Sequence, residues 1–179
     1  MSKKVLVIST SLRSNSNSDL LAQRFAQGAE AAGHQVEMIS LRGKDLRFCN
    51  GCMACLKAPR CVIQDDANAI VAQMGAADII CFATPVYYYE MSGQMKTLLD
   101  RANPLYSTDY AFRDIYLLTA SAEEEDSASD GPVHGLEGWI ACFEKARLAG
   151  VVRGGGANAP GEMAADKLAE AYAMGAAIR

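Results

Sequence analysis

No stretch of the 179-residue sequence approaches the roughly 20 consecutive apolar residues that a membrane-spanning helix needs. Basic residues are scattered, with 17 Lys and Arg against 21 Asp and Glu and a net charge of −4. We therefore expect neither a nucleic acid nor a membrane as a partner. Because an apolar strand is expected to begin at Val5, we expect no signal peptide. We expect a cytoplasmic protein whose six cysteines are reduced unless they bind a metal.

Glycine is absent from the polar stretch Ser9–Ser18, which follows the first apolar segment. The stretch is therefore neither the Gly-x-Gly-x-x-Gly fingerprint of dinucleotide-binding folds nor the Gly-x-x-x-x-Gly-Lys-Ser/Thr phosphate loop. It also lacks the cysteine that a phosphatase loop places before its arginine, so it has no nucleophile for a phosphoenzyme. These absences favour a loop that holds a phosphate over one that transfers it.

The residues that are present in this stretch suit an anion. Val5–Ile8 is a run of four apolar residues, typical of a strand buried on both faces of a parallel sheet. The loop leads into an amphipathic helix, whose first turn offers unpaired N–H groups and the positive end of the helix dipole. Side chains of the loop add further donors, at Ser11, Arg13, Ser16, Asn17 and Ser18. The alternative is an ordinary Ser- and Asn-rich turn with a good helix cap.

Short apolar segments alternate with helical patterns along the chain. We expect strands at residues 5–8, 34–41, 77–83, 115–119 and 150–153, and helices from 20, at 67–74, 92–101 and 133–146, and from 161. This alternation predicts a three-layer, doubly wound α/β fold with a five-stranded parallel sheet. The flavodoxin-like strand order 2-1-3-4-5 suits a phosphate loop after the first strand. We expect one domain over residues 1–179, with a cysteine-containing insertion at 42–64.

In this strand order the first and third strands end at one crevice, where ligands of such sheets bind. Ser9 and the polar loop would then face Thr84–Tyr89 (T-P-V-Y-Y-Y) and residues 119–122. Consecutive tyrosines offer flat apolar faces with polar tips, and Pro85 stiffens the segment. A phosphate pocket beside an aromatic wall suits a flat heteroaromatic ring joined to a phosphate, a description that FMN fits. Alternatively, the tyrosines are core or dimer contacts.

Three segments carry a family resemblance: S-L-R-S-N-S-N-S at 11–18, the cysteine loop running into C-V-I-Q-D-D at 61–66, and T-P-V-Y-Y-Y-E-M-S-G-Q-M-K-T-L-L-D-R at 84–101. Over residues 3–120 the sequence resembles the NADPH-dependent FMN reductase and iron–sulfur flavoprotein families. The resemblance implies a flavodoxin-like fold that binds FMN, usually as a homodimer, with the phosphate in the first loop. The isoalloxazine ring would be bordered by Thr84, Pro85, Val86, Tyr87 and Tyr88, with Ala120 and Ser121 nearby.

Thr10 departs from the family pattern, since it stands where the family usually has glycine before Ser-x-Arg. A β-branched residue rarely takes a positive φ, so we expect ordinary backbone angles at this position.

Four of the six cysteines form the pattern C-x2-C-x2-C-x5-C, at Cys49, Cys52, Cys55 and Cys61. Structural zinc usually pairs two separated C-x2-C knuckles, whereas overlapping knuckles followed by a more distant cysteine are typical of ferredoxin-like cluster binding. The spacing also resembles the compact motif of iron–sulfur flavoproteins. We predict these four residues as ligands of a 4Fe–4S cluster, with zinc or a metal-free rim of the active site as the alternatives. The remaining two cysteines, Cys81 and Cys142, are expected to be small buried apolar residues.

These features predict an FMN-dependent oxidoreductase in which the cofactor carries the chemistry and no side chain need act as an acid or base. Electrons would pass from NAD(P)H through FMN to a small-molecule acceptor: a quinone, an azo or nitro aromatic, a free flavin, or the iron–sulfur cluster.

Two alternatives stay open. The first is a ferredoxin-linked electron carrier that uses no nicotinamide. The second is a binding module that kept the fold without catalysis.

Overall fold

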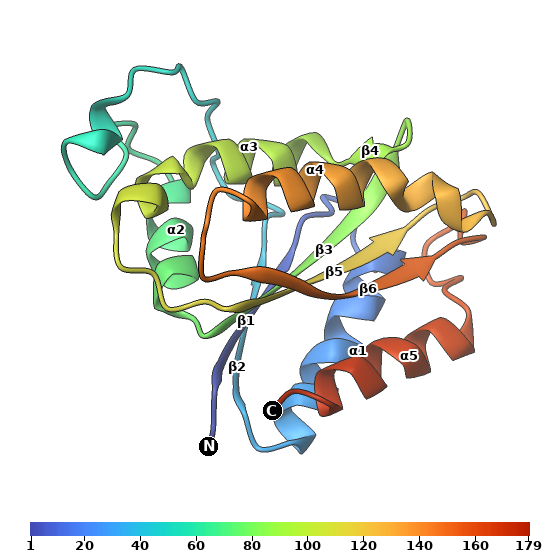
Figure 1. Ribbon diagram of the computed structural model, residues 1–179. Coiled ribbons are helices and arrows are strands. Elements are labelled where there is room, and N and C mark those ends of the chain that lie inside the picture. Colours follow the sequence, from blue (N-terminus) through green and yellow to red (C-terminus); the bar gives the residue numbers. More distant parts are fainter.

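The computed structural model describes residues 1–179 and forms a parallel sheet between two layers of helices (Figure 1). The strands are β1 (Lys4–Ser9), β2 (Gln35–Ser40), β3 (Ile79–Tyr87), β4 (Glu90–Met91), β5 (Asp114–Ala120) and β6 (Arg147–Gly154). The helices are α1 (Asn17–Ala31), α2 (Ala67–Ala76), α3 (Gly93–Arg101), α4 (Asp130–Ile140) and α5 (Ala165–Ala176). Short 3-10 turns lie at Ala54–Leu56, Asn103–Ser107 and Asp126–Ser129. No helix has the length and apolar character of a membrane span.

The five long strands are parallel and follow the order β2-β1-β3-β5-β6, which confirms the predicted doubly wound sheet. β5 and β6 are the fourth and fifth long strands, so this order is the predicted 2-1-3-4-5. The sequence did not predict β4, a two-residue strand that pairs antiparallel with the end of β3. The order reverses between β1 and β3, and the crevice expected at that point is therefore bounded by the loops after these two strands.

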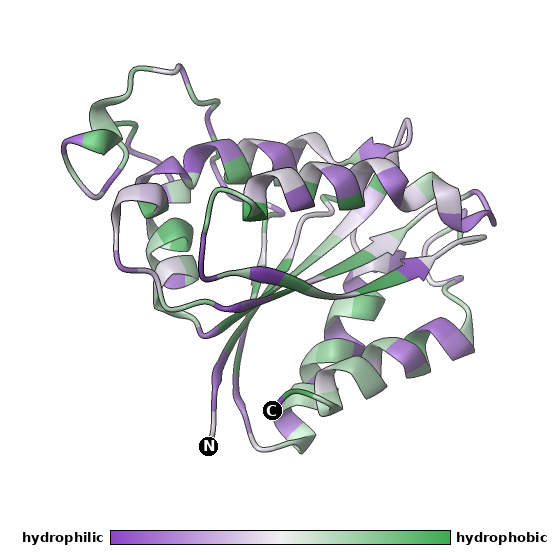
Figure 2. Cartoon of the chain, in the orientation of Figure 1, coloured by the Kyte–Doolittle hydropathy of each residue, from purple (hydrophilic) through white to green (hydrophobic).

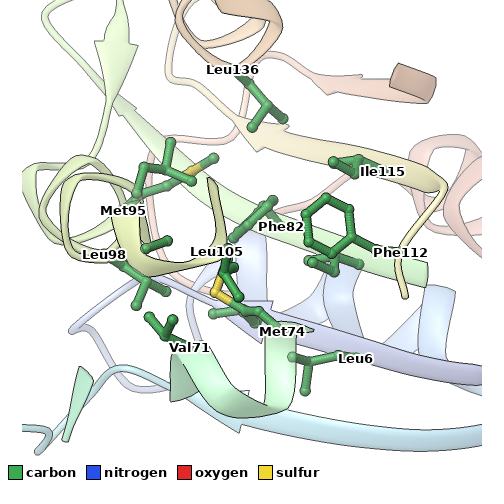
Figure 3. Packing of buried hydrophobic residues seen from close by; sticks show 14 of the residues in the cluster. Leu6, Val71, Met74, Phe82, Met95, Leu98, Leu105, Phe112, Ile115 and Leu136 are labelled. Atoms are coloured by element: carbon green, nitrogen blue, oxygen red, sulfur yellow. The ribbon is translucent and has the colours of Figure 1, made fainter. Parts of the chain in front are cut away.

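Both faces of the sheet are buried, as the continuous apolar runs indicate. Helices α2, α3 and α4 pack on one face, and α1 and α5 pack on the other (Figure 1). Along β5, Ile115 and Leu117 point into the first core, whereas Tyr116 and Leu118 point into the second. Figure 3 shows side chains of the first core gathered between the sheet and its helices. The outward sides of α3 and α4 are mostly hydrophilic, as a half-buried helix requires (Figure 2).

Several element boundaries differ from those expected: α1 begins at Asn17 and β6 at Arg147, each three residues early, and three further differences have clear causes. β3 continues through Tyr87, because its end pairs with β5 and then forms a hairpin with β4. Helix α4 starts earlier than expected and ends at Ile140, after which turns bring buried Phe143 against Trp139. Helix α5 begins at Ala165 instead of near Gly161, which has a positive φ of 84° and lies in a loop.

Helices α1 and α5 cross at a pair of glycines. A Cβ atom added to Gly28 would overlap the carbonyl oxygen of Tyr172, and one added to Gly175 would overlap that of Phe25. The two backbones are therefore in direct contact, and any side chain at either position would force the helices apart.

We expect Gly175→Ala to destabilise the fold by about 1–3 kcal/mol, because the new methyl group meets rigid backbone. Urea unfolding measures the change. The matched control is Gly138→Ala, an exposed helical position with open space around it, which should gain about 0.5–1 kcal/mol from helix propensity. Equal effects in the two variants would contradict the close helix crossing.

Candidate functional site

A crevice of about 200 Å³ opens at the carboxyl edge of the sheet, at the reversal between β1 and β3. Its walls come from the loop before α1, the end of β3, the end of β5 and the segment after β6. The lining residues are Ser11, Arg13, Ser16, Asn17, Ser18, Pro85, Val86, Tyr87, Ala120, Ala122, Ala157 and Asn158. Arg13 is the single charged residue among them, so the crevice presents one cation and otherwise hydroxyl, amide and apolar groups.

Nine of the thirteen residues predicted to bind the cofactor line this crevice, and four do not. Ser9 is buried and its hydroxyl donates to Asp19, and the hydroxyl of buried Ser121 donates to the carbonyl of Glu123 over 2.9 Å. Thr84 is buried beneath the crevice wall. Tyr88 is fully exposed at the tip of the β3–β4 hairpin, where its φ is 50°.

The polar loop is organised by the start of helix α1. Ser16 is the N-cap residue, and its hydroxyl accepts the amide of Asp19 at 3.1 Å. The hydroxyls of Ser16 and Ser18 lie 3.2 Å apart, and the amide of Arg13 donates to the hydroxyl of Ser11 over 3.2 Å. The Arg13 side chain forms no ion pair within the protein and is exposed. The loop thus gathers donors and one uncommitted positive charge at a helix N-terminus, which is a favourable setting for an anion.

Thr10 ties this loop to the opposite wall. Its amide and its hydroxyl both donate to the carbonyl of Ala83, over 2.9 and 3.0 Å, and its hydroxyl lies 3.0 Å from that of Ser92. Ser92 caps helix α3, and its amide donates to the hydroxyl of Thr84 over 3.0 Å. Thr10, Ser92 and Thr84 are completely buried. The φ of Thr10 is not positive, which confirms the ordinary backbone angles expected there.

Asn17 holds the segment after β6 against the crevice. Its side-chain NH₂ group donates to the carbonyls of Ala157 and Ala159, over 3.1 and 2.8 Å. Its side-chain oxygen accepts the amides of Glu162 and Met163, over 3.0 and 3.1 Å. All four hydrogen-bonding positions of the amide are used, so the side chain of Asn17 positions a neighbouring segment and has no free donor for an anion.

Ala122 lies in the segment 119–122 that was expected at the crevice, whereas sequence reasoning missed Ala157 and Asn158 as lining residues. A signal for these two was present in the run Gly154–Gly156, which ends the last strand at the same edge of the sheet. A glycine run at the carboxyl end of a strand beside the crevice indicates a close approach of backbone.

The cysteine-containing segment 42–64 is irregular, as expected, and lies at the end of α3 that is remote from β4 (Figure 1). Cys49, Cys52, Cys55 and Cys61 all line a second cavity of about 640 Å³, with apolar walls that include Trp139 and Phe143. No three metal-ligating side chains converge as they would around one small ion. Gly51, between the first two cysteines, has a φ of 68° and makes the tight turn expected of it.

The expectation for the other two cysteines is half right. Cys81 is completely buried in β3, and burial raises the pKa of its thiol well above the ordinary value. Cys142 is exposed and lines the second cavity together with the four motif cysteines, so its assignment as a buried apolar residue was wrong. The reason is that α4 ends at Ile140, and the turn after it faces outward.

A buried ion pair fixes the base of the cysteine segment. The guanidinium of Arg101 forms two hydrogen bonds to the carboxylate of Asp65, of 2.5 and 2.8 Å, and both side chains are inaccessible to solvent. Burial raises the pKa of Asp65, but the hydrogen bonds and charge of Arg101, with the amides of Arg47 and Ala67, bring the pKa below its ordinary value. The carboxylate is therefore held ionised in the interior.

Similarity to known proteins extends over most of the chain. The sequence profile described as NADPH-dependent FMN reductase matches residues 3–174. An iron–sulfur flavoprotein of Methanocaldococcus jannaschii is 39% identical over 102 residues, which cover 57% of this chain and 53% of that protein. The chain thus spans about half the length of this curated relative.

Two solved structures share the fold. An NAD(P)H:quinone oxidoreductase from Methanothermobacter marburgensis superposes with a TM-score of 0.77 at 17% identity, and the match covers 100% of both chains. A flavodoxin, WrbA-like protein from Agrobacterium tumefaciens gives a TM-score of 0.65 at 18% identity, over 98% of this chain and 94% of the other. At these identities the similarity concerns the fold, and it confirms the predicted flavodoxin-like architecture.

We expect Asn17→Asp to destabilise the protein by about 1–3 kcal/mol, because two carbonyl acceptors lose their donors and face a carboxylate instead. Urea unfolding measures the change. Asn158→Asp, which places the same charge at an exposed position of the same crevice, should stay within about 0.5 kcal/mol of wild type. A similar loss of stability in both variants would show that the added charge, and not the loss of the Asn17 hydrogen bonds, is responsible.

The buried pair predicts a pH dependence of stability. The lowered pKa of Asp65 means that its stabilising contribution is present above the ordinary pKa of about 3.9 and is lost as the pH falls through the folded-state value. Wild type should therefore be more stable than Asp65→Asn at neutral pH, by about 3–5 kcal/mol, and this difference should shrink in acid. Asp45→Asn, at an exposed carboxylate, serves as the control. A difference that is constant from neutral to acidic pH would contradict the assignment.

Proposed function

The chain belongs to the NADPH-dependent FMN reductase family, and on this premise we propose that its crevice binds FMN for an NAD(P)H-dependent oxidoreductase reaction. The phosphate would lie in the loop of Ser11, Arg13 and Ser16–Ser18. The isoalloxazine ring would lie against Pro85–Tyr87, with Ala120 beside it.

The observation that carries this proposal is the composition of the crevice. It places one uncommitted cation and a cluster of hydroxyls at the N-terminus of α1, directly across from an apolar and aromatic wall. The donors suit a phosphate dianion, and the half-exposed ring of Tyr87 suits contact with a flat heteroaromatic system. The two walls are held at a fixed separation by the buried hydroxyls of Thr10 and Ser92, so the chain's residues fit the proposed cofactor.

The role of the protein in this reaction is binding and orientation. Bound FMN supplies the hydride and electron chemistry that no side chain of the crevice offers. No histidine and no carboxylate lines the crevice, so its own residues hold the phosphate, orient the ring and leave proton transfer to solvent. NAD(P)H is the proposed electron donor, and a small molecule such as a quinone or an azo or nitro aromatic is the proposed acceptor. A homodimer stays a prediction.

A second candidate function rests on the cysteine cavity. All four motif cysteines line one open cavity without converging on a single point, which suits a four-iron cluster better than a lone ion. We also infer that Cys49, Cys52, Cys55 and Cys61 hold such a cluster, which would make the chain an iron–sulfur flavoprotein. The similarity to the Methanocaldococcus jannaschii protein of that name supports this inference.

The FMN assignment predicts a phosphate-specific effect of Arg13. Arg13→Met removes a charge-assisted contact of about 1.5–3 kcal/mol, so the Kd for FMN should rise about 10–100-fold. The Kd for riboflavin, which lacks the phosphate, should not change. Quenching of flavin fluorescence in the apoprotein gives both values.

The matched control for this test is Arg24→Met, at an exposed position of α1 outside the crevice, which should leave both Kd values unchanged. An equal rise in the two Kd values of Arg13→Met would show that Arg13 does not hold the phosphate. Absence of measurable FMN binding by wild type would overturn the proposed function itself.

A further inference from the structure

Arg101 is an arginine at the end of α3 whose side chain is fully buried. Its Nη1 group donates to the carbonyl of Arg47 and to Asp65, over 2.8 and 2.5 Å. Its Nη2 group donates to the carbonyl of Ile63 and to Asp65, over 3.1 and 2.8 Å. The remaining donor, Nε, is the single buried side-chain nitrogen or oxygen of the protein without a hydrogen-bond partner.

These four hydrogen bonds close the base of the cysteine segment. Arg47 lies two residues before Cys49, and Ile63 lies two residues after Cys61, so one guanidinium joins the chain on both sides of the motif. The closed base sets where the first and last motif cysteines leave the body of the protein.

The unpaired Nε–H of Arg101 lies near a cavity that a motif cysteine also lines. Arg101 and Cys61 line the same cavity. A buried cationic N–H without an acceptor is costly, and a thiolate or sulfide at this position would satisfy it.

A second donor to the motif comes from Asn103, two residues after Arg101. The side-chain NH₂ group of Asn103 donates to the sulfur of Cys55 over 3.0 Å. The backbone amide of Gly51 also lies 3.5 Å from the sulfur of Cys49. Asn103, from outside the cysteine segment, thus donates to one of the four sulfurs, and the loop's own backbone donates to another. Such hydrogen bonds help to set the reduction potential of a cluster.

We propose that Arg101 and Asn103 are positioning residues for the thiolates of the motif: Arg101 closes the segment and its unpaired Nε–H is available to a sulfur atom in the cavity that Cys61 lines, while Asn103 supports Cys55. This inference rests on the four-iron cluster of the second candidate function. With that cluster bound, the two residues help to retain it. Their N–H groups also raise its reduction potential, because they stabilise the more negative reduced state.

The test uses the full chain, purified without oxygen, in three variants. Asn103→Asp replaces the donor facing Cys55 by an acceptor of the same shape. Arg101→Met combined with Asp65→Leu removes both buried charges together, so that neither is left unpaired. Lys96→Met is the control, because it removes one positive charge from an exposed position of the same helix. Urea unfolding establishes that each variant is folded.

Three readouts are independent of enzymatic activity: iron and acid-labile sulfide per chain, the rate of iron loss to a chelator, and the midpoint potential from a titration followed by electron paramagnetic resonance. We expect Asn103→Asp and the double variant to hold iron about 10–100-fold more weakly than wild type and to titrate at lower potential. Lys96→Met should match wild type in all three readouts. If the double variant does not fold, Asn103→Asp alone decides.

The outcomes separate this inference from the function on which it rests. An iron-containing wild type whose iron retention and potential are unchanged in Asn103→Asp and in the double variant would overturn the role of the two donors and leave the cluster in place. A wild-type protein without iron or sulfide after anaerobic purification would overturn the cluster, and the inference with it. If Lys96→Met changed iron retention and midpoint potential as much as the other variants do, net charge would explain the effect, and the inference would also be overturned.

Discussion

The hydrogen bonds of Thr10 join the two halves of the crevice, and the geometry of the site depends on them. The Thr10 hydroxyl binds the carbonyl of Ala83 on β3 and the hydroxyl of Ser92, which begins α3. The loop after β1, the end of β3 and the start of α3 are therefore held together in a completely buried network. Buried hydroxyls are stable only when they are paired, so the network admits little change in the distance between the walls. A site that recognises a rigid two-part ligand requires such a constraint.

The overall fold could be predicted from the sequence because its signals are local. Four consecutive apolar residues at Val5–Ile8 indicate a strand buried on both faces, and the alternation of strands and helices along the chain implies a doubly wound sheet. The strand order then brings the ends of β1, β3 and β5 to one edge. Most residues predicted to bind the cofactor line one crevice for this reason, although they come from segments about 70 and 110 residues apart.

The details that sequence reasoning missed depend on contacts between distant residues. The four hydrogen bonds of the Asn17 side chain reach residues about 140 positions away, and nothing near Asn17 indicates that its amide is already occupied. Thr84 and Ser121 look like exposed loop residues but are buried by neighbouring strands. The outward orientation of Cys142 follows from where α4 ends, and helix ends are poorly determined by local sequence. The local sequence pattern was enough to predict where the crevice lies. Which of its side chains remain available to a ligand depends on tertiary packing, which the pattern does not show.

The measurement that tests the central claim most directly is the flavin content of the protein purified without oxygen. FMN released by acid is quantified per chain, and the visible spectrum of the intact protein is followed on addition of NAD(P)H. The proposed function predicts about one FMN per chain and bleaching of its visible bands by the nicotinamide. A colourless protein that takes up no FMN when the cofactor is supplied would contradict it.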